Sequence, residues 1–343
     1  MLVTGGAGYI GSHICVELLQ SGFEVVVVDN LSNSCHEALN RVEQITKKGL
    51  SFYQIDLCDK DNLVTVFESE SFDAVIHLAG LKAVSESCEQ PLMYYQNNLT
   101  STLVLVEVMQ QFNIRNIVFS SSATVYGDPE TVPINEVFPL SCTNPYGQSK
   151  LMIEKILEDI SGISSKGLNV IVLRYFNPAG AHESGLIGES PGSVPNNLFP
   201  YVSQVVAGKL DKVLVFGDDY PTNDGTGIRD YIHVVDLAKG HLKALEVLEI
   251  SETSSCKVYN LGTGKGYSVL EVIEAFHQVS GQDVPYEVKA RRAGDIAYCY
   301  ADSSLANKEL AWQAEKTLTD MVSDAWRWQN NNPEGFTDED SGK

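Results

Sequence analysis

A tyrosine and a lysine stand four residues apart in the stretch NPYGQSKLMIE, at residues 144–154. In a helix these positions share one face, so the Tyr146 phenol and the Lys150 ammonium group can approach one site. Lowering the pKa of a tyrosine from about 10 to about 7 requires roughly 4 kcal/mol. An ammonium group about 5 Å away supplies about 3 kcal/mol at an effective dielectric constant near 20. The spacing therefore favours a phenolate that acts as a general base, although ordinary surface helices also carry such pairs.

A serine and a glycine-rich turn add to this chemistry. Ser122, in FSSSATVYG, ends an apolar run, and open α/β sheets bind their ligands at the carboxyl ends of strands. In TGGAGYIG, Gly5, Gly8 and Gly11 stand between a strand and a helix, where backbone amides can approach a pyrophosphate. Asp29 ends the next strand, about 20 residues further on. A carboxylate at that position binds ribose hydroxyls and repels a 2′-phosphate, so the pattern predicts NAD rather than NADP as the cofactor.

The elements that must position these residues alternate between strand and helix in the first half of the chain. Apolar runs predict strands at 1–5, 24–30, 51–57, 72–80, 115–122 and 168–177. Helical patterns lie between them at 11–21, 34–48, 60–69, 91–112 and 145–161. Strands that are apolar throughout are buried on both faces, so we expect a doubly wound, parallel, Rossmann-like sheet.

The alternation of strand and helix patterns is interrupted after residue 176, where loops rich in Gly, Pro and Asn follow. At 343 residues the chain exceeds the usual size of one core. We therefore expect an NAD-binding domain at 1–176, rejoined by a strand and helix at about 230–250, and a smaller mixed α/β substrate lobe at 177–229 and 251–335. Residues 336–343 are expected to form an acidic tail.

Composition excludes several classes of protein. The formal net charge of −21 argues against general binding of nucleic acid, because a phosphate backbone requires a basic face. Without a run of about 18 apolar residues, no membrane span is expected. The seven cysteines and seven histidines show no metal-binding spacing, so no metal is expected. Scattered cysteines and the absence of a leader sequence favour a cytoplasmic protein.

The order of Gly turn, Asp, Ser and Tyr-x-x-x-Lys resembles the extended short-chain dehydrogenase/reductase family. Further motifs resemble the UDP-galactose 4-epimerase family within it, and together they run from residue 1 to about residue 330. These motifs are TGGAGYIGSH, DNLSNS, HLAGLKAV, SSSATVYGD, NPYGQSK, LRYFNPAGAH, PNNLFPY, FGDDYPTNDGTGIRDYIHVVDLA, YNLGTGKGYSVLEV and RRAGDIA.

The resemblance implies an isomerase that interconverts UDP-galactose and UDP-glucose at C4, through a transient 4-keto sugar and a tightly held NAD. By similarity, Tyr146 takes the proton from the 4-hydroxyl group, Ser122 hydrogen bonds the same oxygen, and Lys150 tunes Tyr146 and holds the nicotinamide ribose. A homodimer is also implied, through helices near 91–112 and 145–161. Their apolar faces include Leu103, Val106, Met152 and Ile156, which could equally pack on the chain's own sheet.

The same resemblance supplies two sets of binding residues. The cofactor set is Gly5, Gly8, Tyr9, Ile10, Gly11, Asp29, Asn30, Asn33, Asp56, Leu57, Ala79, Gly80, Lys82, Asn97, Tyr146, Lys150 and Phe176. The substrate set is Ser122, Asn177, Asn197, Leu198, Phe216, Arg229, Arg292, Asp295 and Cys299. The chemistry agrees with the second set, because two arginines offer a diphosphate two guanidinium forks.

One position departs from the family pattern. The family often carries a bulky tyrosine that faces the 2-position of the sugar, and here Cys299 stands at that place. A smaller side chain leaves room for an N-acetyl group, so UDP-GlcNAc and UDP-GalNAc are expected to be substrates too. A shift of one residue would bring Tyr298 or Tyr300 into the gap and remove this room.

Three other functions compete with epimerisation of a UDP-hexose. A nucleotide-sugar 4,6-dehydratase needs an acidic pair just before VYG, and here Ala123 and Thr124 occupy those positions. A UDP-uronate or UDP-pentose 4-epimerase uses closer chemistry and remains open. A non-catalytic NAD-sensing protein has no reason to combine Ser122, Tyr146 and Lys150.

Overall fold

The computed structural model describes residues 1–163, 167–192, 194–249, 254–292 and 294–336. Its large sheet contains β1 (Leu2–Thr4), β2 (Val26–Asp29), β3 (Ser51–Gln54), β4 (Ala74–His77), β5 (Asn116–Ser122), β6 (Asn169–Tyr175) and β10 (Cys256–Leu261). The strands are all parallel, in the order β10-β6-β5-β4-β1-β2-β3. The order reverses between β1 and β4, which is where a doubly wound sheet opens a crevice for ligands.

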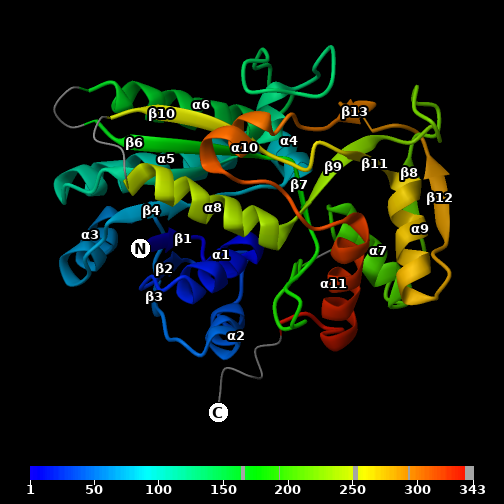
Figure 1. Ribbon diagram of the computed structural model, residues 1–343, viewed down its shortest axis with the longest axis horizontal. Helices are drawn as coiled ribbons and strands as arrows, with labels where there is room; N and C mark the ends of the chain where they lie inside the picture. Colours follow the sequence, from blue (N-terminus) through cyan, green and yellow to red (C-terminus); the bar gives the residue numbers. More distant parts are fainter. Residues whose placement is uncertain (164–166, 193, 250–253, 293, 337–343) are drawn as a thin grey trace.

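Helices cover both faces of this sheet, as Figure 1 shows. One face packs on α1 (Tyr9–Gln20), α2 (Glu37–Thr46), α8 (Val234–Glu249) and α10 (Ser304–Leu310). The other face packs on α3 (Lys60–Ser69), α5 (Pro91–Gln111) and α6 (Pro145–Ser161). Side chains of both cores are fully buried, among them Ile14 and Leu18 on the first face and Leu105 and Leu157 on the second. The predicted α/β class with a doubly wound parallel sheet is confirmed.

A smaller mixed lobe lies beside the sheet, on the right of Figure 1. It contains α7 (Leu198–Val206), α9 (Val269–Ser280) and α11 (Leu318–Asn331), which bury their apolar faces around Phe199, Val272 and Met321. Its strands are β7 (Asn177–Ala179), β8 (Val213–Phe216), β9 (Ile228–His233), β11 (Gly266–Ser268), β12 (Tyr286–Lys289) and β13 (Tyr298–Cys299). Strand β9 pairs with β7, β11 and β13, and β8 pairs with β12.

The structure differs from the sequence prediction in three places. Strand β10 belongs to the large sheet, although its residues fall within the range assigned to the lobe, because it adds to the edge of β6. The strand expected to return near residue 230 is β9, which joins the small sheet, whereas α8 packs on α1 and the large sheet. Within the first half of the chain, two short helices were not predicted: α4 (Val84–Glu89) and the 3₁₀ helix η1 (Ala123–Tyr126).

The expected acidic tail begins at Phe336, which is half-buried and packs against Trp328 with ring centroids 4.9 Å apart and ring planes tilted by 51°. The remainder of that prediction, residues 337–343, lies outside the described residues.

Candidate active site

The glycine-rich turn lies at the carboxyl end of β1 and leads directly into α1. Gly5 has a φ of +72°, and a Cβ atom there would come within 2.8 Å of the backbone nitrogen of Ala79. A Cβ on Gly11 would lie 2.3 Å from the Gly5 carbonyl oxygen, so only glycine lets the helix begin this close to the strand. Helix α1 starts after Gly8, with no side chain capping its first amides. Such amides fit a pyrophosphate group.

The predicted ribose-binding acid, Asp29, lies next to this turn. Asp29 is the last residue of β2 and is buried, and its carboxylate accepts hydrogen bonds from the Ala7 amide at 3.1 Å and the Leu31 amide at 2.9 Å. Beside it, the side-chain amide of Asn30 donates to the exposed carboxylate of Asp56 at 3.0 Å. The turn, the helix N-terminus and the acid are therefore adjacent, and this arrangement fits the adenosine half of NAD.

The reactive groups lie where β5 ends and α6 begins. Asn144 caps α6 by accepting the Gly147 amide at 2.8 Å, which fixes the first helical turn and thus Tyr146. Lys150 is 5% exposed, and its ammonium group donates to the Ser120 carbonyl at 2.8 Å. The ammonium nitrogen lies 6.0 Å from the centroid of the Tyr146 ring. The structure thus brings the predicted phenol and ammonium group together at the edge of the sheet.

Electrostatics at this edge differ from the expectation for Tyr146. Burial raises the pKa of its phenol, and the hydrogen bond with Ser122 acts in the opposite direction. Burial also lowers the pKa of Lys150 to about 8, partly offset by the negative charge of Glu154. The expected fall in the tyrosine pKa is therefore absent here, because the ammonium group is directed at the Ser120 carbonyl while burial disfavours the phenolate.

Four residues of the predicted substrate set meet in the smaller lobe. The Asp295 carboxylate accepts from Arg292 Nε at 3.0 Å and lies 4.0 Å from Arg229 Nη2. The Arg292 guanidinium stacks over the Phe216 ring, 4.5 Å from its centroid. Arg229 is held further by hydrogen bonds from its Nη1 to two backbone carbonyls, each at 2.9 Å. Two cations and an aromatic face thus point to one place.

Glu189, which no sequence pattern indicated, carries a carboxylate that links the two predicted sets. Glu189 Oε1 accepts from the Asn197 side-chain amide at 2.7 Å and lies 3.5 Å from the Lys82 ammonium nitrogen. Its backbone carbonyl accepts from Trp328 Nε1 at 3.0 Å, and a Cβ on the preceding Gly188 would overlap the Trp328 ring. The motif GES offered no signal in sequence, because Glu189 reaches Lys82 only through the tertiary fold.

Other predicted residues lie around these groups. The Tyr9 hydroxyl donates to the Gly180 carbonyl at 2.7 Å, and a Cβ on Gly80 would meet the Asn98 side chain at 3.1 Å. Leu57 and Phe176 are buried. The remaining members are half-buried or exposed: Ile10, Asn33, Ala79, Asn97, Asn177, Leu198 and Cys299. Among them, Cys299 on β13 pairs with Arg229 on β9.

No group of three or more histidine, cysteine or acidic side chains is arranged to hold a metal ion within the ranges that the structure describes. The same residues contain no helix long and apolar enough to cross a membrane.

Comparison with known proteins identifies relatives of this chain. The family model described as GDP-mannose 4,6 dehydratase matches residues 2–325. UDP-glucose 4-epimerase of Bacillus subtilis strain 168 is 60% identical over 336 residues, 98% of each chain. The human UDP-glucose 4-epimerase is 53% identical over 343 residues, again 98% of each chain. The chain belongs to the UDP-glucose 4-epimerase family of extended short-chain dehydrogenases/reductases.

Solved structures of the family agree with this assignment. The crystal structure of UDP-glucose 4-epimerase from Bifidobacterium longum, in complex with NAD+ and UDP, superimposes with a TM-score of 0.93 at 54% identity. It covers 98% of this chain and 99% of its own. At the two positions where a dehydratase needs acidic groups, η1 carries Ala123 and Thr124, and Thr124 Oγ1 donates to Ser122 Oγ at 3.0 Å. The dehydratase alternative therefore lacks its proton donor in the structure as well.

Proposed function

We propose that the protein interconverts UDP-galactose and UDP-glucose by inverting C4 of the sugar, as an NAD-dependent isomerase. The observation that carries this proposal is the identity of 60% to an epimerase along 98% of both chains, together with a matching site. When bound, NAD supplies the hydride acceptor for C4 and a positive ring charge. We assign its binding to the cofactor set above, on the 1–176 domain, and substrate binding chiefly to residues 177–229 and 262–335.

In this proposal Tyr146 takes the proton of the 4-hydroxyl group. It returns the proton after the 4-keto sugar has rotated to present its opposite face. Burial favours the neutral phenol in the free protein, so deprotonation depends on nearby positive charge. The Lys150 ammonium group, whose nitrogen lies 6.0 Å from the ring centroid, is one such charge, and the bound nicotinamide ring would be a second. Ser122 hydrogen bonds the same sugar oxygen and holds it near the phenol.

The arginine cluster supports recognition of the UDP group. Arg229 and Arg292 offer two guanidinium groups on one side of Asp295, despite the net charge of −21 of the chain. Charge-assisted hydrogen bonds of this kind suit a diphosphate, and the face of Phe216 suits a base. Asn177, Asn197 and Leu198 complete the proposed substrate set.

We also propose that UDP-GlcNAc and UDP-GalNAc are substrates. Cys299 packs against the cluster that contains Phe176 and Ala301, and burial raises the pKa of its thiol to about 11, so it remains neutral. Its neighbour Tyr298 is directed elsewhere, since its hydroxyl donates to the Pro221 carbonyl at 2.7 Å. Alternation along a strand places neighbouring side chains on opposite faces. The small side chain of Cys299 therefore supports the proposal that an N-acetyl group fits beside the 2-position of the sugar.

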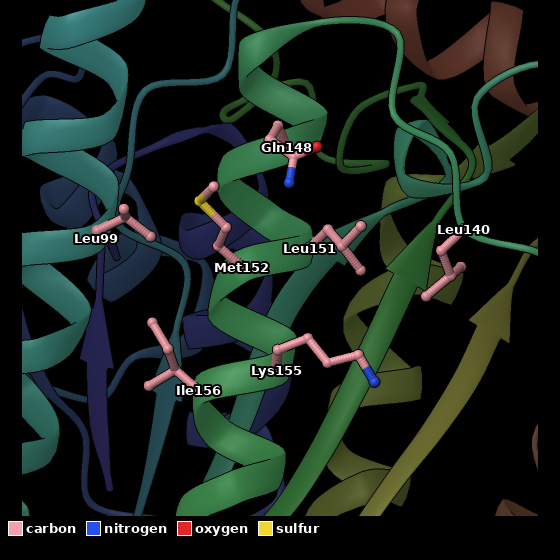
Figure 2. Close-up of a pocket in the computed structure, with 7 residues that line it drawn as sticks. All are labelled: Leu99, Leu140, Gln148, Leu151, Met152, Lys155 and Ile156. Carbon is pink, nitrogen blue, oxygen red and sulfur yellow. The ribbon is translucent and has the colours of Figure 1, made fainter.

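A homodimer is proposed through the outer faces of α5 and α6. Figure 2 shows Leu99 on α5 and Leu140 from a loop on either side of Met152 and Ile156 on α6. These side chains line an apolar hollow of about 480 Å³ on the side of α6 that faces away from Lys150. Leu103 and Met152 are exposed, whereas Val106 is buried in the chain's own core, so Val106 is removed from the proposed interface.

A cytoplasmic location is part of the same proposal. Free thiols such as those of Cys15 and Cys256 support it, because the cytoplasm keeps thiols reduced.

The proposal is tested by incubating the purified protein with UDP-galactose, UDP-GalNAc and a UDP-pentose, without added NAD, and following the C4 protons by NMR. We expect UDP-glucose and UDP-GlcNAc to form from the two hexoses. Turnover of the pentose alone would support the alternative epimerase and contradict the proposed substrate class.

A further inference from the structure

A buried ion pair lies behind the reactive groups and takes no part in the proton transfer described above. Arg174 on β6 donates to Glu154 on α6 through two hydrogen bonds, Nε to Oε1 at 3.0 Å and Nη2 to Oε2 at 2.6 Å. The two side chains are only 4% and 6% exposed. Removing charges from water is so costly that such a pair often stabilises a fold less than apolar residues would. Stability alone is therefore a weak reason for this pair.

The pair is the centre of a network that joins five elements. Glu154 accepts a hydrogen bond from the Ser121 hydroxyl on β5. Arg174 Nη1 donates to the Tyr126 hydroxyl in η1 at 2.9 Å, and that hydroxyl donates to Asn260 Oδ1 on β10 at 2.7 Å. Asn260 Nδ2 then donates to the Ile134 carbonyl at 2.9 Å. Every member has a partner, as a rigid buried network requires.

This network touches the positions that carry the reactive groups. Ser121 immediately precedes Ser122 on β5, so the hydrogen bond to Glu154 fixes the backbone from which Ser122 projects. On α6, Glu154 follows Lys150 by one turn and Tyr146 by two, on the face that is turned to the sheet. Anchoring Glu154 to β5 and β6 therefore prevents α6 from sliding or rotating against the strand that carries Ser122.

We propose that Glu154 and Arg174 are positioning residues for the epimerisation, which hold α6 against β5 and β6 so that Tyr146, Lys150 and Ser122 face one point. The Glu154 carboxylate has a second effect, since it helps the buried Lys150 side chain to stay charged. The inference rests on the proposed function, because it assumes that Tyr146 and Lys150 act on the sugar.

The charges around Lys150 make Glu154 the group that favours the ammonium form. Burial lowers the pKa of Lys150 to about 8, and Glu154 raises it. His77 on β4 is neutral, because burial lowers its pKa to about 3. Burial raises the pKa of the phenols of Tyr94 on α5 and Tyr175 on β6, so both are neutral too.

Arg174 is also charged, and its pairing with Glu154 raises its own pKa. Replacing Glu154 by a neutral group leaves this positive charge behind and removes the negative one. Both effects lower the pKa of Lys150. Lys150 then loses its positive charge at a lower pH, and the alkaline limb of the activity profile moves to that lower pH.

The test measures kcat and KM for UDP-galactose between pH 6 and 10 in the NAD-loaded enzyme, for Glu154→Gln, Arg174→Lys and Glu158→Gln. Glu158 is the matched control, because it lies one turn further along α6, where it is exposed and pairs with Lys155. We expect Glu154→Gln to lower kcat about tenfold and to move the alkaline limb down by about one pH unit, because one pH unit corresponds to about 1.4 kcal/mol of lost attraction. KM and the amount of NAD bound per chain are expected to stay nearly unchanged, because loss of an interaction made only in the transition state lowers kcat without changing KM.

Arg174→Lys keeps the positive charge and loses the planar fork, so we expect a lower kcat with the alkaline limb at its original pH. If Glu154→Gln does not fold, the kcat of Arg174→Lys alone tests the proposed positioning role. The inference is wrong if Glu154→Gln only lowers the melting temperature while its pH profile coincides with that of Glu158→Gln, or if Arg174→Lys retains full kcat. Failure of the proposed function is a separate result, namely no interconversion of UDP-galactose and UDP-glucose by the unsubstituted protein.

Discussion

On the sheet side of the candidate site the Lys150 ammonium group is buried and held by the backbone, whereas on the lobe side the two arginines are more exposed and both face the Asp295 carboxylate. Lys150 is 5% exposed and bonds to a carbonyl of β5. Arg292 has 58% of its side chain exposed and is fixed by Asp295 and the Phe216 ring. Groups that must react need fixed geometry and low dielectric, while groups that bind a soluble anion must remain accessible. The comparison predicts that changes on the sheet side affect kcat and those on the lobe side affect KM.

The largest effect is expected for Tyr146→Phe, which removes the proposed base but keeps the ring. Because general acid–base groups contribute about 10²–10⁴-fold, kcat for UDP-galactose should fall by about that factor with little change in KM. Steady-state kinetics of the NAD-loaded variant measures it. Tyr286→Phe is the control, since Tyr286 is half exposed on β12. An unchanged kcat at neutral pH would remove the basis of the proposed chemistry.

On the lobe side, Arg229→Met should raise KM for UDP-galactose about 10- to 100-fold, because a hydrogen bond to a charged group is worth about 1.5–3 kcal/mol. The value of kcat should change far less. Arg291→Met is the neighbouring control, because Arg291 already pairs with Asp219 and stacks on Tyr220. If Arg229→Met lowered kcat as strongly as it raised KM, the division between the two sides would fail.

The specificity of the lobe side is tested by Cys299→Tyr. A large side chain in a packed site costs about 1–3 kcal/mol, so turnover of UDP-GalNAc should fall about tenfold or more relative to that of UDP-galactose. Competition between the two substrates in one reaction measures the ratio directly. Cys256→Ser, far along β10, serves as the matched control. Equal loss on both sugars would show that Cys299 does not select at the 2-position.

The smallest effect concerns Glu189, which connects the two sides. Glu189→Gln keeps an acceptor for Asn197 and loses the charge facing Lys82, whose side chain is 56% exposed. An exposed ion pair contributes at most about 1 kcal/mol, so KM should change by about two- to fivefold. Glu183→Gln in the same loop is the control. A hundredfold change in kcat would instead place Glu189 among the reactive groups.

Much of the sheet side could be predicted because its elements are local and regular. The helix at Pro145–Ser161 was predicted at 145–161, and the helix at Lys60–Ser69 at 60–69. Buried parallel strands read as unbroken apolar runs, which makes them visible in sequence. Strand β10 was assigned to the lobe because a segment at the edge of a sheet shows nothing of the partner to which it will pair.

By itself, the sequence determined the glycine turn with its acid, the Tyr146–Lys150 pair on one helical face, and the arginines offered to the substrate. These patterns depend on residue type and on spacing along one element, which the chain carries locally. Only the tertiary structure decided that burial raises the pKa of Tyr146, that Glu189 reaches both Lys82 and Asn197, and that Glu154 pairs with Arg174. Burial and charge pairing depend on which distant segments meet, and no local pattern records that meeting.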